Sequence, residues 1–172
     1  MSTPKEDAEN REVWSVCNQI KHLSSGERAA LRRMELTKAP EADGIVEKLL
    51  RRSGVIIHPD DDLGFEMWRL VVHAASVISG TGSRMAHSSK RPLGRAFSVV
   101  GVKSNSINRL LTSRGPTLAD QIRRAAYLLA GNGDAIPVNL AELRDLAHPD
   151  VRTADKARRT IARAYFAAED LK

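Results

Sequence analysis

Apolar residues recur along this chain at intervals of three and four positions, the spacing of an α-helix that buries one face. Strict alternation of apolar and polar residues, which is typical of strands, is scarce. Prolines and capping residues divide the pattern into about nine helices, and we expect a compact all-α bundle. The expected helices lie at about 5–22, at a short basic stretch ending in Arg32 and Arg33, and at 40–54, 59–78, 92–97, 104–111, 116–131, 137–147 and 149–170.

Several of these helices carry explicit start signals. A serine of the pair at 24 and 25 can cap the basic stretch, and the three aspartates at 60–62 favour the start of the fourth helix. Ser104 or Asn105 is the expected cap of the sixth helix. Pro137 is the expected start of the eighth helix, and Pro149 with Asp150 is the expected start of the last.

The fourth helix is the most apolar and should lie at the centre of the fold. Its core residues would include Phe65, Trp68 and Val72. The segment that follows is rich in Gly, Ser and basic residues, which is typical of a connection. We therefore expect an N-terminal helical lobe at 1–80, a basic connection at 81–91 and a basic C-terminal lobe at 92–172, as one domain overall or as two small lobes sharing a core.

The charge of the chain is unevenly distributed. The 53 residues from Met67 to Ala119, which we call the acid-free interval, contain no Asp or Glu but contain eight Lys and Arg. Residues 1–83 carry 11 basic and 13 acidic side chains, and residues 84–172 carry 16 and 8, so the net charge of +6 is the sum of −2 and +8. Such asymmetry favours a surface that meets phosphate, and nucleic acid is the first candidate.

The last expected helix adds a row of cations to this picture. Arg152, Lys156, Arg159 and Arg163 are spaced i, i+4, i+7 and i+11, which places them within an arc of about 60° on a helix of 3.6 residues per turn. The opposite side carries Val151, Ala154, Ala157, Ile161, Ala164, Tyr165 and Ala168. One face should pack, and the other should present the cations to solvent or to phosphate.

Few residues of the chain support a disulfide, a metal site, a membrane span or catalysis. Cys17 is the single cysteine, so neither a disulfide within the chain nor a cysteine zinc site is expected, and a reducing cytoplasm is the natural location. We expect no membrane span, no metal or cofactor and no catalytic centre, and hence no enzyme activity. His58 with the aspartates at 60–62 is better explained by helix capping than by a cation site, and His73 by a core position.

Six short motifs occur in an order and spacing that match a known family. They are Leu31-Arg32-Arg33, Leu93-Gly94-Arg95-Ala96-Phe97, Arg109-Leu110-Leu111, Gln121-Ile122-Arg123-Arg124, Pro137-Val138-Asn139-Leu140 and Ala162-Arg163-Ala164-Tyr165-Phe166. With these motifs the chain resembles CasB, the small subunit of the type I-E CRISPR Cascade complex, from about residue 12 to residue 166. Two departures are Asn139-Leu140, where the family often has Asp-Trp, and Ile161, where it often has Trp.

The resemblance implies a non-catalytic, all-helical subunit of a ribonucleoprotein used in antiviral defence. It implies two copies per complex, contacts with the backbone and large subunits and with CRISPR RNA, and a basic surface for target DNA, chiefly the displaced strand of the R-loop. The nucleic-acid-binding residues carried over by position are Arg32, Arg33, Arg95, Arg109, Arg114, Arg123, Arg124, Lys156, Arg159 and Arg163, and the spacing of the last helix adds Arg152.

A free-standing helical DNA-binding regulator is the alternative. Such a protein needs a helix-turn-helix whose second helix carries residues that read base edges, and the segment 104–114 is the available candidate. A tightly packed preceding helix is not evident in the sequence, which favours the ribonucleoprotein subunit.

Overall fold

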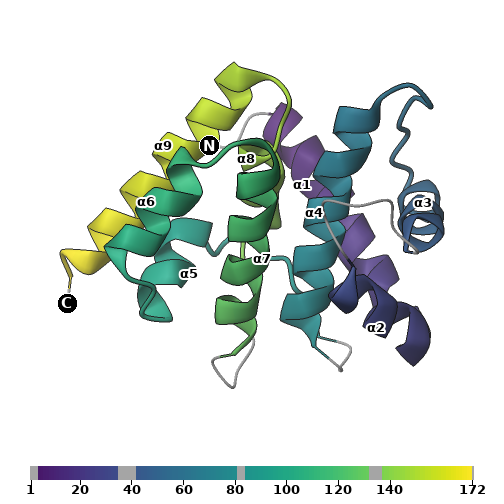
Figure 1. Ribbon diagram of the computed structural model, residues 1–172, viewed down its shortest axis with the longest axis horizontal. Coiled ribbons are helices and arrows are strands. Elements are labelled where there is room, and N and C mark those ends of the chain that lie inside the picture. Colours follow the sequence, from purple (N-terminus) through teal and green to yellow (C-terminus); the bar gives the residue numbers. More distant parts are fainter. Residues whose placement is uncertain (1–3, 35–41, 81–83, 132–136, 172) are drawn as a thin grey trace.

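The computed structural model describes residues 4–34, 42–80, 84–131 and 137–171, and within them it contains nine α-helices (Figure 1). The helices are α1 (Pro4–Ile20), α2 (Ser25–Arg33), α3 (Asp43–Arg52), α4 (Asp62–Ser79), α5 (Leu93–Val99), α6 (Ser104–Thr112), α7 (Gly115–Ala130), α8 (Leu140–Leu146) and α9 (Val151–Glu169). The all-α fold is confirmed. None of the described helices is long and apolar enough to cross a membrane.

Three of the start signals act as the sequence predicts. Ser24 and Glu27 form a capping box on α2, in which the Glu27 amide donates to Ser24 Oγ (3.2 Å) and the Ser24 amide donates to Glu27 Oε2 (2.8 Å). Asp61 caps α4 by accepting from the Gly64 amide (2.9 Å), which confirms capping at the aspartate cluster. Asp150 caps α9 in the same way, through the Thr153 amide (3.0 Å).

Two of the start signals were wrong. Lys103 is the N-cap residue of α6 and no side chain caps this helix, so neither Ser104 nor Asn105 has the predicted role. The eighth helix begins at Leu140 rather than at Pro137, because the backbone of Val138 forms hydrogen bonds with a distant segment of the chain. Its amide donates to Ala86 O (2.9 Å) and its carbonyl accepts from the Ser88 amide (2.9 Å), which forms a short parallel bridge instead of a helical turn.

Helix α4 lies at the centre of the molecule, as expected. It packs against α1, α2, α3, α7 and α8, and its side chains from Met67 to Ser79 are buried except for that of Leu70. In Figure 1, α1–α3 lie beside α4 at one end of the molecule and α5, α6 and α9 at the other end, with α7 and α8 between. One core cluster includes residues of both halves of the chain. The lobe boundary at 81–91 stays a prediction, and residues 81–83 lie outside the described part.

Two buried polar side chains serve the core. Arg69, which lies in the acid-free interval, forms an ion pair with Asp43 (Nε to Oδ1, 3.1 Å) that joins α4 to α3. His73 is fully buried, and its Nδ1 lies 3.0 Å from the Leu31 carbonyl oxygen, which joins α4 to α2. Burial lowers the pKa of His73, so the ring is neutral and Nδ1 donates to this carbonyl. Both residues therefore stabilise the fold, and His73 is the core histidine that the sequence predicts.

Helices α5 and α9 approach each other so closely that only glycine fits between them. A Cβ atom on Gly94 would clash with the carbonyl oxygen of Ile161 and would lie 2.7 Å from the amide nitrogen of Tyr165. The buried Tyr165 hydroxyl then donates to Val102 O (2.6 Å), and Ser98 Oγ donates to Glu169 Oε1 (2.6 Å). These contacts set the orientation of α9, and with it the direction in which its outer face points.

A pH dependence of stability follows from His87, which is 5% exposed and whose Nδ1 accepts from the Leu140 amide (3.2 Å). Burial lowers its pKa from 6.5 to about 4. The unfolded chain therefore takes up this proton near pH 6.5 and the folded protein only near pH 4. We expect the free energy of unfolding to fall by roughly 3 kcal/mol as the pH drops through this window.

Urea unfolding between pH 7.5 and 4.5 measures this effect. The variant His87→Gln should be less stable at pH 7.5 and should show a flatter pH profile than the unsubstituted protein. The matched control is His22→Gln, at an exposed position, which should keep the original profile. An undiminished pH slope in His87→Gln would assign the effect to other groups.

Candidate nucleic-acid interface

The outer face of α9 carries the row of cations predicted from the sequence. Ala154, Ala157, Ile161 and Tyr165 are buried against the core, and Arg152, Lys156, Arg159 and Arg163 are all exposed on the other side of the helix. We call these four residues the α9 stripe. Because Asp150 caps the helix and Gly94 lets α5 approach its inner face, the stripe is held on a rigid element.

Arg159 and Arg163 have no carboxylate partner in the described part of the chain. An exposed guanidinium that is not engaged with a carboxylate can bind phosphate without first breaking an ion pair. Its planar set of donors also fits two oxygens of one phosphate. Arg159 and Arg163 are therefore available to an anionic partner.

A second basic site lies between α6 and α7. Arg109 and Arg124, predicted separately from two motifs, line one groove of about 100 Å³ together with Gln121 and Leu128. Leu128 is 51% exposed. The structure thus brings together two cations that are 15 positions apart in the sequence, beside an apolar side chain on which a base or sugar could rest.

A third site surrounds the start of α5. Lys90, Arg91 and Arg95 line a groove of about 360 Å³ with Val99, which is 63% exposed. Sequence reasoning selected Arg95 and missed Lys90 and Arg91 as partners of it. Lys90 and Arg91 belong to the acid-free interval, so their charge was visible in the sequence. Because they lie in the turn before α5, no helical spacing relates them to Arg95.

The fourth site is at the C-terminal ends of α2 and α4. The Arg32 guanidinium donates to the Gly80 carbonyl (2.9 Å), and the Tyr127 hydroxyl donates to the Arg32 carbonyl (3.0 Å). Arg123 lies one turn before Tyr127 on α7 and close enough to His73 for its charge to lower the pKa of that ring. Arg33 and Arg123 are exposed, but Arg32 is partly engaged in joining α2 to α4.

Arg114 differs from the other candidates because a carboxylate lies beside it. Its Nη2 is 3.4 Å from Asp155 Oδ1, and its Nη1 donates to the Leu111 and Ser113 carbonyls (3.2 and 2.9 Å). The same Asp155 oxygen accepts from Nη1 of Arg158 (3.1 Å), a buried arginine that sequence reasoning missed. Burial, together with the charge of Arg114, lowers the pKa of Arg158.

The two exposed aromatic side chains near these cations are held by packing. Tyr127 is 49% exposed and its hydroxyl is bound to Arg32, while Phe166 is 43% exposed and packs edge-on against Tyr165, with ring centroids 5.2 Å apart. Each keeps part of its ring open to solvent. Base stacking on either ring would use a side chain already held in place.

The eleven predicted residues therefore lie in four basic sites and at Arg114. Within the described residues, no three His, Cys, Asp or Glu side chains gather where they could hold a metal ion. The helix proposed for a free-standing regulator, α6, packs against α7 and α9, while its predecessor α5 packs mainly against α9. This packing is not that of a helix-turn-helix pair. What the sites offer chemically is binding of anions through exposed guanidinium and ammonium groups.

Comparison with known proteins identifies the family. No curated protein and no solved structure matches the chain. The family model described as CRISPR-associated protein Cse2 matches residues 27–166, which span α2 to α9 and all four basic sites. Cse2 is the CasB family that the sequence motifs resemble, and it supplies a structural subunit of the type I-E Cascade complex. The chain belongs to the CRISPR-associated protein Cse2 family.

Proposed function

We propose that this Cascade subunit binds nucleic acid without reading its sequence and thereby stabilises the R-loop, chiefly through the displaced DNA strand. The observation that carries the proposal is the α9 stripe, in which Arg159 and Arg163 are exposed and have no carboxylate partner among the described residues. Phosphate contacts of this kind position a strand but carry no base information. Indifference to sequence suits a subunit that serves every guide RNA.

Modest contacts are sufficient for this role. The RNA–DNA hybrid of an R-loop is about as stable as the DNA duplex that it replaces, so small additional free energies decide whether the R-loop persists. Retaining the displaced strand also opposes re-formation of the duplex. Among the other predicted cations, Arg32, Arg33, Arg95, Arg109, Arg123 and Arg124 would extend the contact or meet the CRISPR RNA.

The same proposal assigns a bridging, non-catalytic role. The subunit would join the backbone-forming and large subunits, act beside a second copy of itself, and leave cleavage to a separate nuclease. The low aromatic content, 4% of residues, supports phosphate contacts rather than base stacking as the main source of affinity.

The salt dependence of binding tests the electrostatic part of this proposal on the isolated chain. If about six phosphates are contacted, the affinity for DNA should fall by about a thousandfold between 50 and 200 mM salt, because each contact releases condensed counterions. Fluorescence anisotropy with DNA oligomers of the same length and different sequence measures this fall. Oligomers of scrambled sequence should bind equally, and either salt-independent binding or a strong sequence preference would contradict the proposal.

A further inference from the structure

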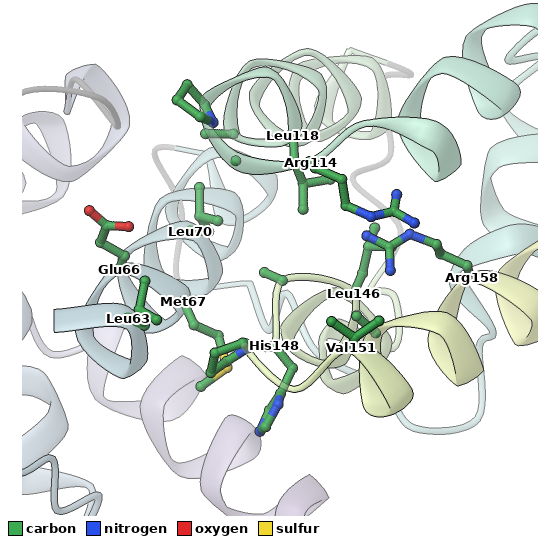
Figure 2. Close-up of a pocket in the computed structure, with 16 residues that line it drawn as sticks. Leu63, Glu66, Met67, Leu70, Arg114, Leu118, Leu146, His148, Val151 and Arg158 are labelled. Carbon is green, nitrogen blue, oxygen red and sulfur yellow. The ribbon is translucent and has the colours of Figure 1, made fainter. Parts of the chain in front are cut away.

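A groove that none of the four basic sites includes lies where α4, α7 and α9 begin and α8 ends (Figure 2). Its volume is about 410 Å³, in the range of sites that enclose several side chains or a small ligand. We call it the end groove. Its apolar lining comes from four helices and includes Leu63, Met67, Leu70, Leu118, Leu146 and Val151.

The rims of the end groove expose large apolar side chains to solvent. Leu63 at the start of α4 is 61% exposed and Val151 at the start of α9 is 66% exposed. Covering such surface stabilises a complex by about 25 cal/mol for each Å² removed from water. Exposed apolar side chains beside a groove are typical of protein contact sites.

One side of the end groove is positively charged. Arg114 and Arg158 point toward one another there (Figure 2), and both contact the same oxygen of Asp155, so two cations share one carboxylate. The side chain of Arg114 is 56% exposed, and its 3.4 Å contact with Asp155 is the longer of the two. Arg114 can therefore donate to a second carboxylate while Arg158 keeps Asp155 in place.

The occupant that fits these features is a protein segment rather than a nucleic acid. A sugar-phosphate chain would leave the apolar floor uncovered, and Glu66 on the other side of the groove would repel its phosphates (Figure 2). A peptide satisfies both sides, since an apolar side chain covers the floor and a carboxylate beside it pairs with Arg114. Glu66 is then free to accept from a backbone amide or a basic side chain of the same segment.

We propose that the end groove binds an acidic, apolar segment of another Cascade subunit, with an apolar side chain on the floor and an adjacent Asp or Glu on Arg114. This inference rests on family membership and is independent of the role of the α9 stripe. It assigns Arg114 to a protein contact, which accounts for its position apart from the four basic sites.

Site-specific cross-linking in the assembled complex tests the proposal. A photo-reactive amino acid at position 63, where Leu63 lies on the rim, would be activated in Cascade containing CRISPR RNA, and the cross-linked peptide identified by mass spectrometry. We expect a peptide of a different subunit in which an apolar residue neighbours Asp or Glu. Cross-links confined to nucleic acid or to a second copy of this chain, or none at all, would overturn the proposal.

Substitution on the rim gives an independent measurement. The double variant Leu63→Asp/Val151→Asp should bind at least tenfold more weakly to a Cascade complex assembled without this subunit. The two aspartates add charge to the apolar rim and repel the carboxylate of the bound segment. The matched control is Ile56→Asp, at a loop position that is 95% exposed and outside the groove. It should bind as the unsubstituted chain does, and equal binding by the double variant would contradict the proposal.

The isolated double variant should retain its helical circular dichroism and at least half of its affinity for DNA. Retained DNA affinity with lost assembly separates the end groove from the nucleic-acid interface. Loss of both would show that the rim lies within the DNA site, and would overturn the assignment to a protein partner.

Discussion

Replacing Arg159 and Arg163 by glutamate weakens nucleic-acid binding by roughly 10- to 100-fold at 100 mM salt, because two phosphate contacts contribute about that factor through counterion release. The slope of affinity against salt should fall by about two. Both side chains are exposed on the middle of α9, so circular dichroism should be unchanged. In Cascade bearing the variant, the R-loop should dissociate faster, which is measurable with a labelled displaced strand.

The matched control reverses two arginines at the other end of the molecule. Arg51 and Arg52 are exposed at the end of α3, far from α9 in Figure 1, and Arg51→Glu/Arg52→Glu lowers the net charge by the same four units. We expect it to bind nucleic acid within about threefold of the unsubstituted chain, through the weaker long-range effect of net charge. Equal weakening by both variants would mean that total charge, rather than the α9 stripe, determines binding.

Gly94→Ala should destabilise the fold by about 3 kcal/mol or more. The new Cβ would meet the backbone of Ile161 and Tyr165 rather than a movable side chain, so α9 must shift away from α5. For a chain of this size, that loss lowers the midpoint of thermal unfolding by about 6–12 °C. Because α9 moves, the Tyr165–Val102 hydrogen bond should also be strained, and calorimetry measures the sum.

A second glycine provides the control for this substitution. Gly44 lies in α3, where a Cβ atom would meet no other atom within 4 Å, and its φ is not in the left-handed region. Gly44→Ala should therefore stabilise the protein by about 0.5–1 kcal/mol through its better helix propensity. Comparable destabilisation by the two substitutions would show that the close contact of α5 with α9 does not limit stability.

Much of the helical architecture could be predicted because its determinants are local. Ser24, Asp61 and Asp150 each cap a helix through an amide three residues later, and a spacing of three is visible in any sequence. The eighth helix was misplaced because the backbone of Val138 bonds to Ala86 and Ser88, about 50 residues away. No local pattern announces such a partner.

In the candidate interface, too, local features could be predicted and tertiary contacts could not. Helical spacing alone separates Arg159, which is exposed, from the buried side of α9, and the spacing was sufficient to predict the stripe. It could not reveal that Arg158 donates to the Leu111 carbonyl (2.9 Å) or that Arg32 donates to Gly80, since both acceptors are more than 40 residues away. Arg144 is a similar case, buried beside Asp145 and Glu12. Charge patterns predict cations well, but their partners depend on the tertiary fold.

The most direct test of the central claim is to identify what the α9 stripe touches in the working complex. Thr160 is exposed on α9 between Lys156 and Arg163, and a photo-reactive amino acid at this position can be cross-linked in Cascade bound to target DNA with each strand labelled separately. We expect cross-links to the displaced strand, at the same distance from the start of the R-loop for targets of different sequence. Cross-links only to the CRISPR RNA, the target strand or a neighbouring subunit would contradict the proposed function.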